Sequence, residues 1–180
     1  MSGNVLLPYI PETITVHLGP PSVDAANVTV PFTDYIKNVA SSEIYPTWPE
    51  NALRANILAQ ISFTLNRVYT EFYRSRGYSF DITNSTAFDQ SFVNGRDIFE
   101  NISQLVDEIF DQYLRRTGSV EPLFATYCDG VRVQCDGLSQ WGSVDLAENG
   151  RTPYEILTYY YGDNLAIVRN APIAALTESY

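Results

Sequence analysis

An apolar stripe at helical spacing is the feature that most constrains the fold of this chain. The stripe repeats every three or four positions and consists of Leu53, Ile57, Ile61, Leu65, Val68 and Phe72. This spacing predicts a long amphipathic helix whose stripe faces a core. Pro49 suits the first turn of that helix, which we expect to run to about Arg74. Pro46 and Pro49 together exclude a continuous helix through residues 42–49.

The remaining pattern predicts a mixed α+β fold. A second long amphipathic helix is expected over 96–115, with shorter helices over 33–41, 139–148 and 153–161. Alternating or β-rich runs predict short strands over 13–18, 27–32, 79–83 and 165–168, and His17 lies out of phase with its apolar neighbours, so it should face solvent. The Asp129-Gly130 pair predicts a β-hairpin over 124–134. We expect one compact domain over 1–180, with a short tail from about residue 170.

Composition excludes several classes of function. Acidic residues outnumber basic ones by 21 to 11, so a nucleic acid or an anionic membrane surface is not an expected partner. No apolar run is long enough to span a bilayer, and no basic region with an apolar stretch marks a signal peptide at the start, so we expect synthesis in the cytoplasm. With one histidine and no phosphate-binding glycine motif, neither a metal site nor a cofactor is expected.

The two cysteines, Cys128 and Cys135, leave three alternatives open. A two-residue turn at Asp129-Gly130 would separate the sulfur atoms by about 13 Å along a strand, which favours free thiols and an intracellular site of synthesis. A disulfide would require a wider loop and the loss of that turn. Shared metal binding is the third alternative, although the spacing does not match a standard zinc site.

Glu43 is the candidate catalytic residue. Its neighbours Ile44, Tyr45, Pro46 and Trp48 are largely apolar, and such surroundings raise the pKa of a carboxyl because its charged form loses hydration. A general acid near neutral pH needs this raised pKa. From these residues alone, a solvated loop residue or a helix cap is the favoured interpretation of a glutamate at this place.

Two separated motifs resemble the SpoIID/LytB family, the stage II sporulation protein D group. Residues 43–56, EIYPTWPENALRAN, resemble the family's E-M-P-x-x-W-P-x-E-A-L-K-A-Q, which precedes a long helix. Residues 137–142, GLSQWG, and the following EIL and YYYG resemble a second family motif near the C-terminus. Asp89-Gln90 corresponds more weakly to a central glutamine of the family.

The resemblance implies lytic transglycosylation of peptidoglycan glycan strands with Glu43 as general acid and base. It also implies a set of substrate contacts: Tyr45, Trp48, Asp89, Gln90, Ser139, Gln140 and Trp141. The two tryptophans could instead be core residues, and Ser139 and Gln140 could cap or solvate a helix. The altered motif residues favour an alternative function, a non-catalytic glycan-binding or structural subunit of a spore or cell-wall layer. Either function implies action at the spore or cell wall, and self-association would fit the second.

Overall fold

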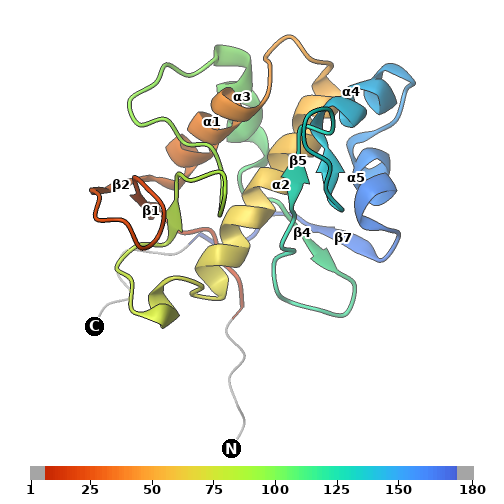
Figure 1. Cartoon of the computed structure of the whole chain (residues 1–180). Helices are drawn as coiled ribbons and strands as arrows, with labels where there is room; N and C mark the ends of the chain where they lie inside the picture. Colours follow the sequence, from red (N-terminus) through yellow and green to blue (C-terminus); the bar gives the residue numbers. More distant parts are fainter. Residues whose placement is uncertain (1–6, 174–180) are drawn as a thin grey trace, which may run out of the picture.

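The computed structural model describes residues 7–173, which form a compact α+β fold (Figure 1). The tail expected from about residue 170 is described only as far as Ile173. The helices in this part of the chain are α1 (Phe32–Glu43), α2 (Glu50–Tyr69), α3 (Glu100–Ile109), α4 (Gln140–Glu148) and α5 (Pro153–Tyr161), with a 3-10 turn η1 (Arg74–Arg76). The strands are β1 (Thr13–His17), β2 (Asn27–Pro31), β3 (Ile82–Thr83), β4 (Tyr113–Arg116), β5 (Tyr127–Cys128), β6 (Leu138–Ser139) and β7 (Leu165–Val168).

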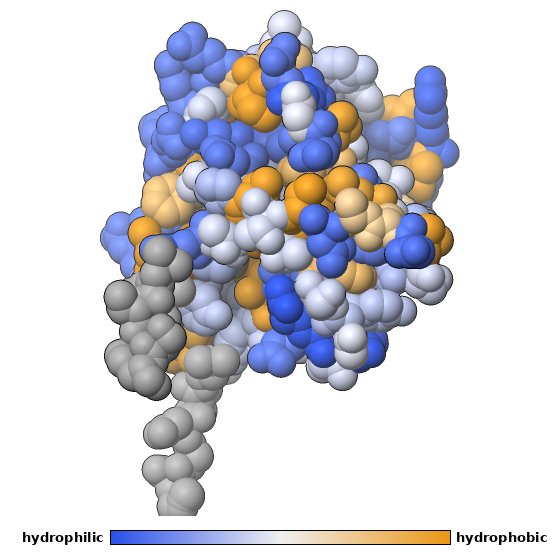
Figure 2. All heavy atoms as spheres, turned by 90° about the vertical axis from the view of Figure 1, so that its left-hand side faces the viewer, coloured by the Kyte–Doolittle hydropathy of each residue, from blue (hydrophilic) through white to orange (hydrophobic). Residues whose placement is uncertain are grey.

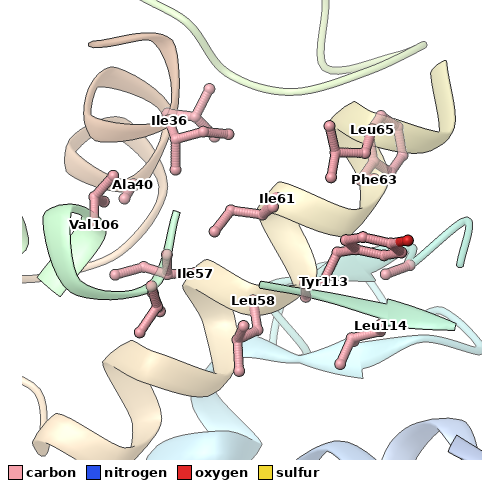
Figure 3. Packing of buried hydrophobic residues seen from close by; sticks show 14 of the residues in the cluster. Ile36, Ala40, Ile57, Leu58, Ile61, Phe63, Leu65, Val106, Tyr113 and Leu114 are labelled. Atoms are coloured by element: carbon pink, nitrogen blue, oxygen red, sulfur yellow. The ribbon is translucent and has the colours of Figure 1, made fainter. Parts of the chain in front are cut away.

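Helix α2 runs through the centre of the molecule. Helices α1 and α3 lie on one side of it, and α4, α5 and the β4–β7 pair lie on the other (Figure 1). Fifteen of its 20 residues are buried, so the stripe from Leu53 to Val68 is only part of a helix enclosed on almost every side. The helix ends at Tyr69 rather than near Arg74, and Phe72 of the predicted stripe lies beyond it. Ile57 and Ile61 point towards α1 and α3 (Figure 3). The Phe63 ring centroid lies 4.9 Å from that of Phe124 and 6.1 Å from that of Tyr127.

The strands form small sheets rather than one large one. β1 pairs with β2 in antiparallel and with β3 in parallel orientation, and its inward residues Ile14 and Val16 are fully buried, as the alternation predicted. The prediction for His17 was wrong, because its ring is buried and stacks on Phe80 at 4.4 Å. Its Nδ1 and Nε2 also form hydrogen bonds with Asn27 Oδ1 and the Val23 carbonyl. These two bonds replace the hydrogen bonds to water that the ring loses on burial.

The predicted helix over 96–115 is shorter than expected. It covers only Glu100–Ile109, and the chain then forms β4, which pairs with β7 in antiparallel register. Apolar residues at 105, 109 and 113 keep helical spacing across this boundary, which misled the prediction. Two contacts fix the strand instead: the ladder to β7, and the Leu114 N–H, which donates to Ser62 Oγ of α2 at 2.9 Å.

The β-hairpin predicted over 124–134 is absent from the described structure. β5 pairs in parallel with β6, and the residues between them form a loop closed by a disulfide between Cys128 and Cys135. The Cα atoms of the two cysteines lie 6.2 Å apart, within reach of a bridge. The expectation of free thiols was therefore wrong, because it rested on the hairpin. Asp129 side-chain bonds within this loop, described below, replace the two-residue turn.

On the face that carries β1, β2, α1 and α3, hydrophobic residues lie in separate groups among hydrophilic ones (Figure 2). Within residues 7–173, no helix combines the length and apolar character needed to cross a lipid bilayer.

The close approach of β6 to β5 yields a prediction about Gly137. A Cβ atom at this position would lie 2.0 Å from the Thr126 carbonyl oxygen, which already accepts hydrogen bonds from the Leu138 N–H and the Tyr161 hydroxyl. We expect Gly137→Ala to lower the free energy of unfolding by about 2–3 kcal/mol, because backbone must move to relieve the overlap. Urea denaturation measures this change.

Gly19→Ala serves as the control for that measurement. The nearest atom to its added Cβ is the Ala25 Cβ at 3.3 Å, so the expected loss is below about 1 kcal/mol. Equal losses from the two variants would contradict the argument from close approach.

Candidate functional site

Glu43 is the last residue of α1. The helix ends there because Ile44 adopts extended backbone and is buried, and Pro46 has no N–H to continue a helical ladder. The next segment, 44–49, leads into α2. Glu43 therefore leaves the helix where two segments distant in sequence, around Ser91 and Tyr127, approach its carboxyl.

Hydrogen bonds and burial together set the protonation of Glu43. The Ser91 N–H donates to Oε2 at 3.1 Å, and the Tyr127 hydroxyl donates to the same atom at 3.0 Å. Burial is the largest influence and raises the pKa of Glu43 above its ordinary value of 4.5. The bonds from Ser91 and Tyr127, with a smaller contribution from Gln140, oppose this rise because they stabilise the ionised form. The direction of the shift agrees with the expectation from its apolar neighbours.

Tyr127 acts as a permanent donor to this carboxyl. Burial, followed by the charge of Glu43, raises the pKa of the Tyr127 hydroxyl well above its ordinary value of 10. The hydroxyl therefore keeps its proton at any pH at which the protein would act.

Glu43 lines three surface hollows in the described part of the chain. The largest, about 510 Å³, lies beside Tyr45, Trp48 and Trp141. A second, of about 310 Å³, is bordered by Tyr127 and by Thr86, and a third of about 290 Å³ extends towards Arg96 and Phe99. The carboxyl thus lies where several concave surfaces meet, and it forms no salt bridge within residues 7–173.

Three aromatic side chains form what we call the aromatic platform: Tyr45, Trp48 and Trp141. Their ring centroids lie 4.8–5.8 Å apart. Tyr45 is 58% exposed and Trp141 42% exposed, so the platform presents ring surface to solvent next to Glu43. Exposed rings of this kind stack on the apolar faces of sugars. The structure therefore brings together three of the predicted substrate contacts.

Gln140 and Ser139 differ in their positions. Gln140 lines two of the hollows with Glu43, and its side chain helps to stabilise the ionised Glu43 carboxyl. This side chain is buried beside the Glu43 carboxyl. Ser139 is instead the N-cap of α4, where its Oγ accepts from the Gly142 N–H at 2.9 Å. It does not border the hollows around Glu43.

Asp89 and Gln90 bind other residues of the protein interior through their side chains. The Asp89 side chain is fully buried, pairs with Arg67 at 2.7 Å, and accepts from Tyr73 and Thr83. Gln90 is fully buried, and its side chain joins Tyr35 and Thr64 to the Gln60 carbonyl. These contacts indicate that both residues support the site by fixing the segment that carries Ser91. Direct contact of either with a substrate stays a prediction.

Sequence reasoning missed Tyr127, and it left the disulfide that closes the loop of residues 129–137 only as an alternative. Asp129 organises that loop, because its Oδ1 accepts from the N–H groups of residues 131, 132 and 133 at 2.9–3.0 Å. These bonds, led by that of Val133, hold the pKa of Asp129 below its ordinary value. The loop carries Arg132 and Val131 to the rim of the largest hollow.

Comparison with known protein families matches residues 23–115 to SpoIID, described as stage II sporulation protein. The match covers just over half of the 180-residue chain. This chain belongs to the SpoIID family. Membership associates it with sporulation and cell-wall processes. The matched segment of this SpoIID protein contains Glu43, Asp89 and Gln90, but ends before Ser139. No curated protein matches the chain.

Metal ligation has no obvious location in this SpoIID protein. Within residues 7–173, no three side chains of histidine, cysteine, aspartate or glutamate gather closely enough to hold an ion. The cysteines that could have contributed thiolates are joined to each other.

The raised pKa of Glu43 makes stability depend on pH. A carboxyl whose pKa is higher in the folded than in the unfolded chain stabilises the fold below 4.5, and this contribution is lost as pH rises through the raised pKa. The free energy of unfolding of Glu43→Gln, relative to that of the wild type, should therefore be higher at pH 8 than at pH 4. Urea denaturation of both proteins at the two pH values measures this difference. An equal effect of the substitution at both would show that burial does not control the carboxyl.

The disulfide should contribute measurably to stability. Replacing Cys128 and Cys135 together by serine should lower the free energy of unfolding by about 2.5 kcal/mol, the value expected for a closed loop of this length. Denaturation in the absence of reductant tests this expectation. A thiol titration of the denatured wild type is the control, and two titratable thiols would contradict the bridge.

Proposed function

We propose that this SpoIID protein is a peptidoglycan lytic transglycosylase in which Glu43 is the general acid and then the general base. One observation carries the proposal: a carboxyl with a raised pKa lines surface hollows beside the exposed aromatic platform and is paired with no cation in residues 7–173. Family membership supports the cell wall as the place of action.

The proposed reaction requires one carboxyl group. Protonated Glu43 donates its proton to the glycosidic oxygen as the bond from muramic acid C1 to that oxygen breaks. The muramic acid 6-hydroxyl then forms a bond to C1, and the Glu43 carboxylate accepts the hydroxyl proton. The products are a 1,6-anhydro end and a new 4-hydroxyl on the next sugar, so all atoms balance without water.

The surroundings of Glu43 suit a carboxyl group that acts first as an acid and then as a base. Hydrogen bonds from Ser91 and Tyr127 stabilise the carboxylate left after the first step, whereas burial favours the protonated form needed to begin it. A glycosidase pair would need a second available carboxyl nearby. The two other carboxylates that line hollows with Glu43, Asp89 and Asp129, are already engaged by Arg67 and by backbone N–H groups.

The aromatic platform and Gln140 provide the proposed binding contacts. Rings of Tyr45, Trp48 and Trp141 would stack on sugar faces, and Gln140, which lines two of the hollows, would border the bound sugar.

Cleavage of peptide-stripped peptidoglycan strands tests the proposal. We expect the wild type to release products ending in 1,6-anhydromuramic acid, detected by mass spectrometry, and Glu43→Gln to reduce their rate at least about 100-fold. The control is Glu148→Gln, a change of the same kind at an exposed position of α4, which should retain full activity.

Two results would contradict the assignment. Equal rates for wild type and Glu43→Gln would exclude Glu43 as the acid. Strand binding by the wild type without any product would instead favour the non-catalytic alternative, a glycan-binding or structural subunit of a spore or cell-wall layer.

A further inference from the structure

The loop closed by the disulfide brings one cation to the candidate site. Arg132 lines the largest hollow together with Glu43, Gln140 and the aromatic platform. This hollow has a volume of about 510 Å³. No other lysine or arginine lines it in the described part of the chain. In a chain with a net charge of −10, a cation at this rim needs an explanation.

We propose that Arg132 binds a carboxylate carried by the glycan and thereby determines which strands this site selects. The inference rests on the proposed function, because it names a feature of the same substrate. The ligand chemistry is a carboxylate attached to a sugar that stacks on the aromatic platform.

The side chain of Arg132 is available for this role. Arg54, Arg67 and Arg74 form salt bridges with carboxylates of the chain itself. Among residues 7–173, the guanidinium of Arg132 forms no salt bridge, and its residue is exposed. Its positive charge makes a small contribution to holding the pKa of Asp129 below its ordinary value.

The Asp129 carboxylate accepts hydrogen bonds from the loop backbone and forms no salt bridge with Arg132 in residues 7–173. Its Oδ1 accepts three backbone N–H groups of the loop, which offset its negative charge locally and fix the backbone of Arg132. The disulfide between Cys128 and Cys135 closes the same loop covalently. Arg132 is thus presented from a constrained backbone, which reduces the entropy lost when it binds.

The arrangement suits an anionic sugar. Trp141 and Arg132 line the same hollow, so a sugar stacked on Trp141 lies on the surface that the planar guanidinium borders. The guanidinium can bind a carboxylate of that sugar with two parallel hydrogen bonds. A solvent-exposed ion pair contributes up to about 1 kcal/mol, so the expected effect is about fivefold in affinity. That size suits selection between strands rather than the chemistry at Glu43.

Muramic acid offers two sources of such a carboxylate. One is its own lactyl group, which is free when the stem peptide is absent. The other is the stem peptide itself, which carries free carboxyl groups. Strands of three kinds distinguish them: peptide-stripped strands, the same strands with their carboxyl groups converted to amides, and strands that retain stem peptides.

Binding is measured on a Glu43→Gln background, so that strands remain intact, with and without Arg132→Gln. We expect Arg132→Gln to weaken binding of one carboxylate-bearing strand about fivefold and to leave binding of amidated strands unchanged. Arg132→Lys should retain part of the preference for carboxylate-bearing strands over amidated ones. Arg151→Gln, which removes one exposed positive charge outside the hollow, is the matched control and should change none of the affinities.

Each outcome decides the inference. If Arg132→Gln weakens binding of peptide-stripped strands, the ligand is the lactyl carboxylate. If it weakens binding of peptide-bearing strands alone, the ligand is a carboxyl group of the stem peptide. Equal affinities of the Arg132→Gln and parent proteins for every strand would overturn the role of Arg132. If the wild type also cleaves strands, the proposed function survives that result, whereas absence of both binding and cleavage overturns the two together.

Discussion

The burial of α2 is the constraint on which the rest of the structure depends. A helix enclosed over 15 of its 20 residues must be covered on opposite sides, and α1 with α3, and α4 with α5 and β4, provide that cover. Polar side chains on such a helix need partners from the covering elements. Asn56 therefore donates to Ser143 of α4, Ser62 accepts from Leu114 of β4, and Thr64 donates to Gln90. These bonds fix the register of the covering segments.

The candidate site forms where this covering is incomplete. The segment around Gln90 is held against α2 by interior hydrogen bonds, and this places the Ser91 N–H on Glu43. From the opposite direction, β5 brings Tyr127 to the same carboxyl oxygen. The acid is consequently buried enough to have a raised pKa while it still lines surface hollows.

Rigid interior contacts and the disulfide-closed loop serve different parts of the site. Interior contacts determine the protonation of Glu43, because its surroundings come from α1, β5 and the Ser91 segment. The loop closed by Cys128 and Cys135 determines what lies at the rim, because Asp129 and the disulfide fix the backbone that carries Arg132. The proposed chemistry at Glu43 and the proposed strand selection at Arg132 can therefore be altered by separate substitutions.

The sequence by itself determined the α+β class, the long central helix, α5, the alternating strand β1, and the family, because these depend on local periodicity or on contiguous motifs. It also indicated Glu43, whose apolar neighbours are adjacent in the chain. Only the tertiary structure decided that His17 is buried, that β4 is a strand, and that the cysteines are joined. It alone brought Tyr127 to Glu43 and Arg132 to the rim of the hollow. These features depend on contacts between residues far apart in sequence or on loop closure, and neither leaves a periodic pattern in the chain.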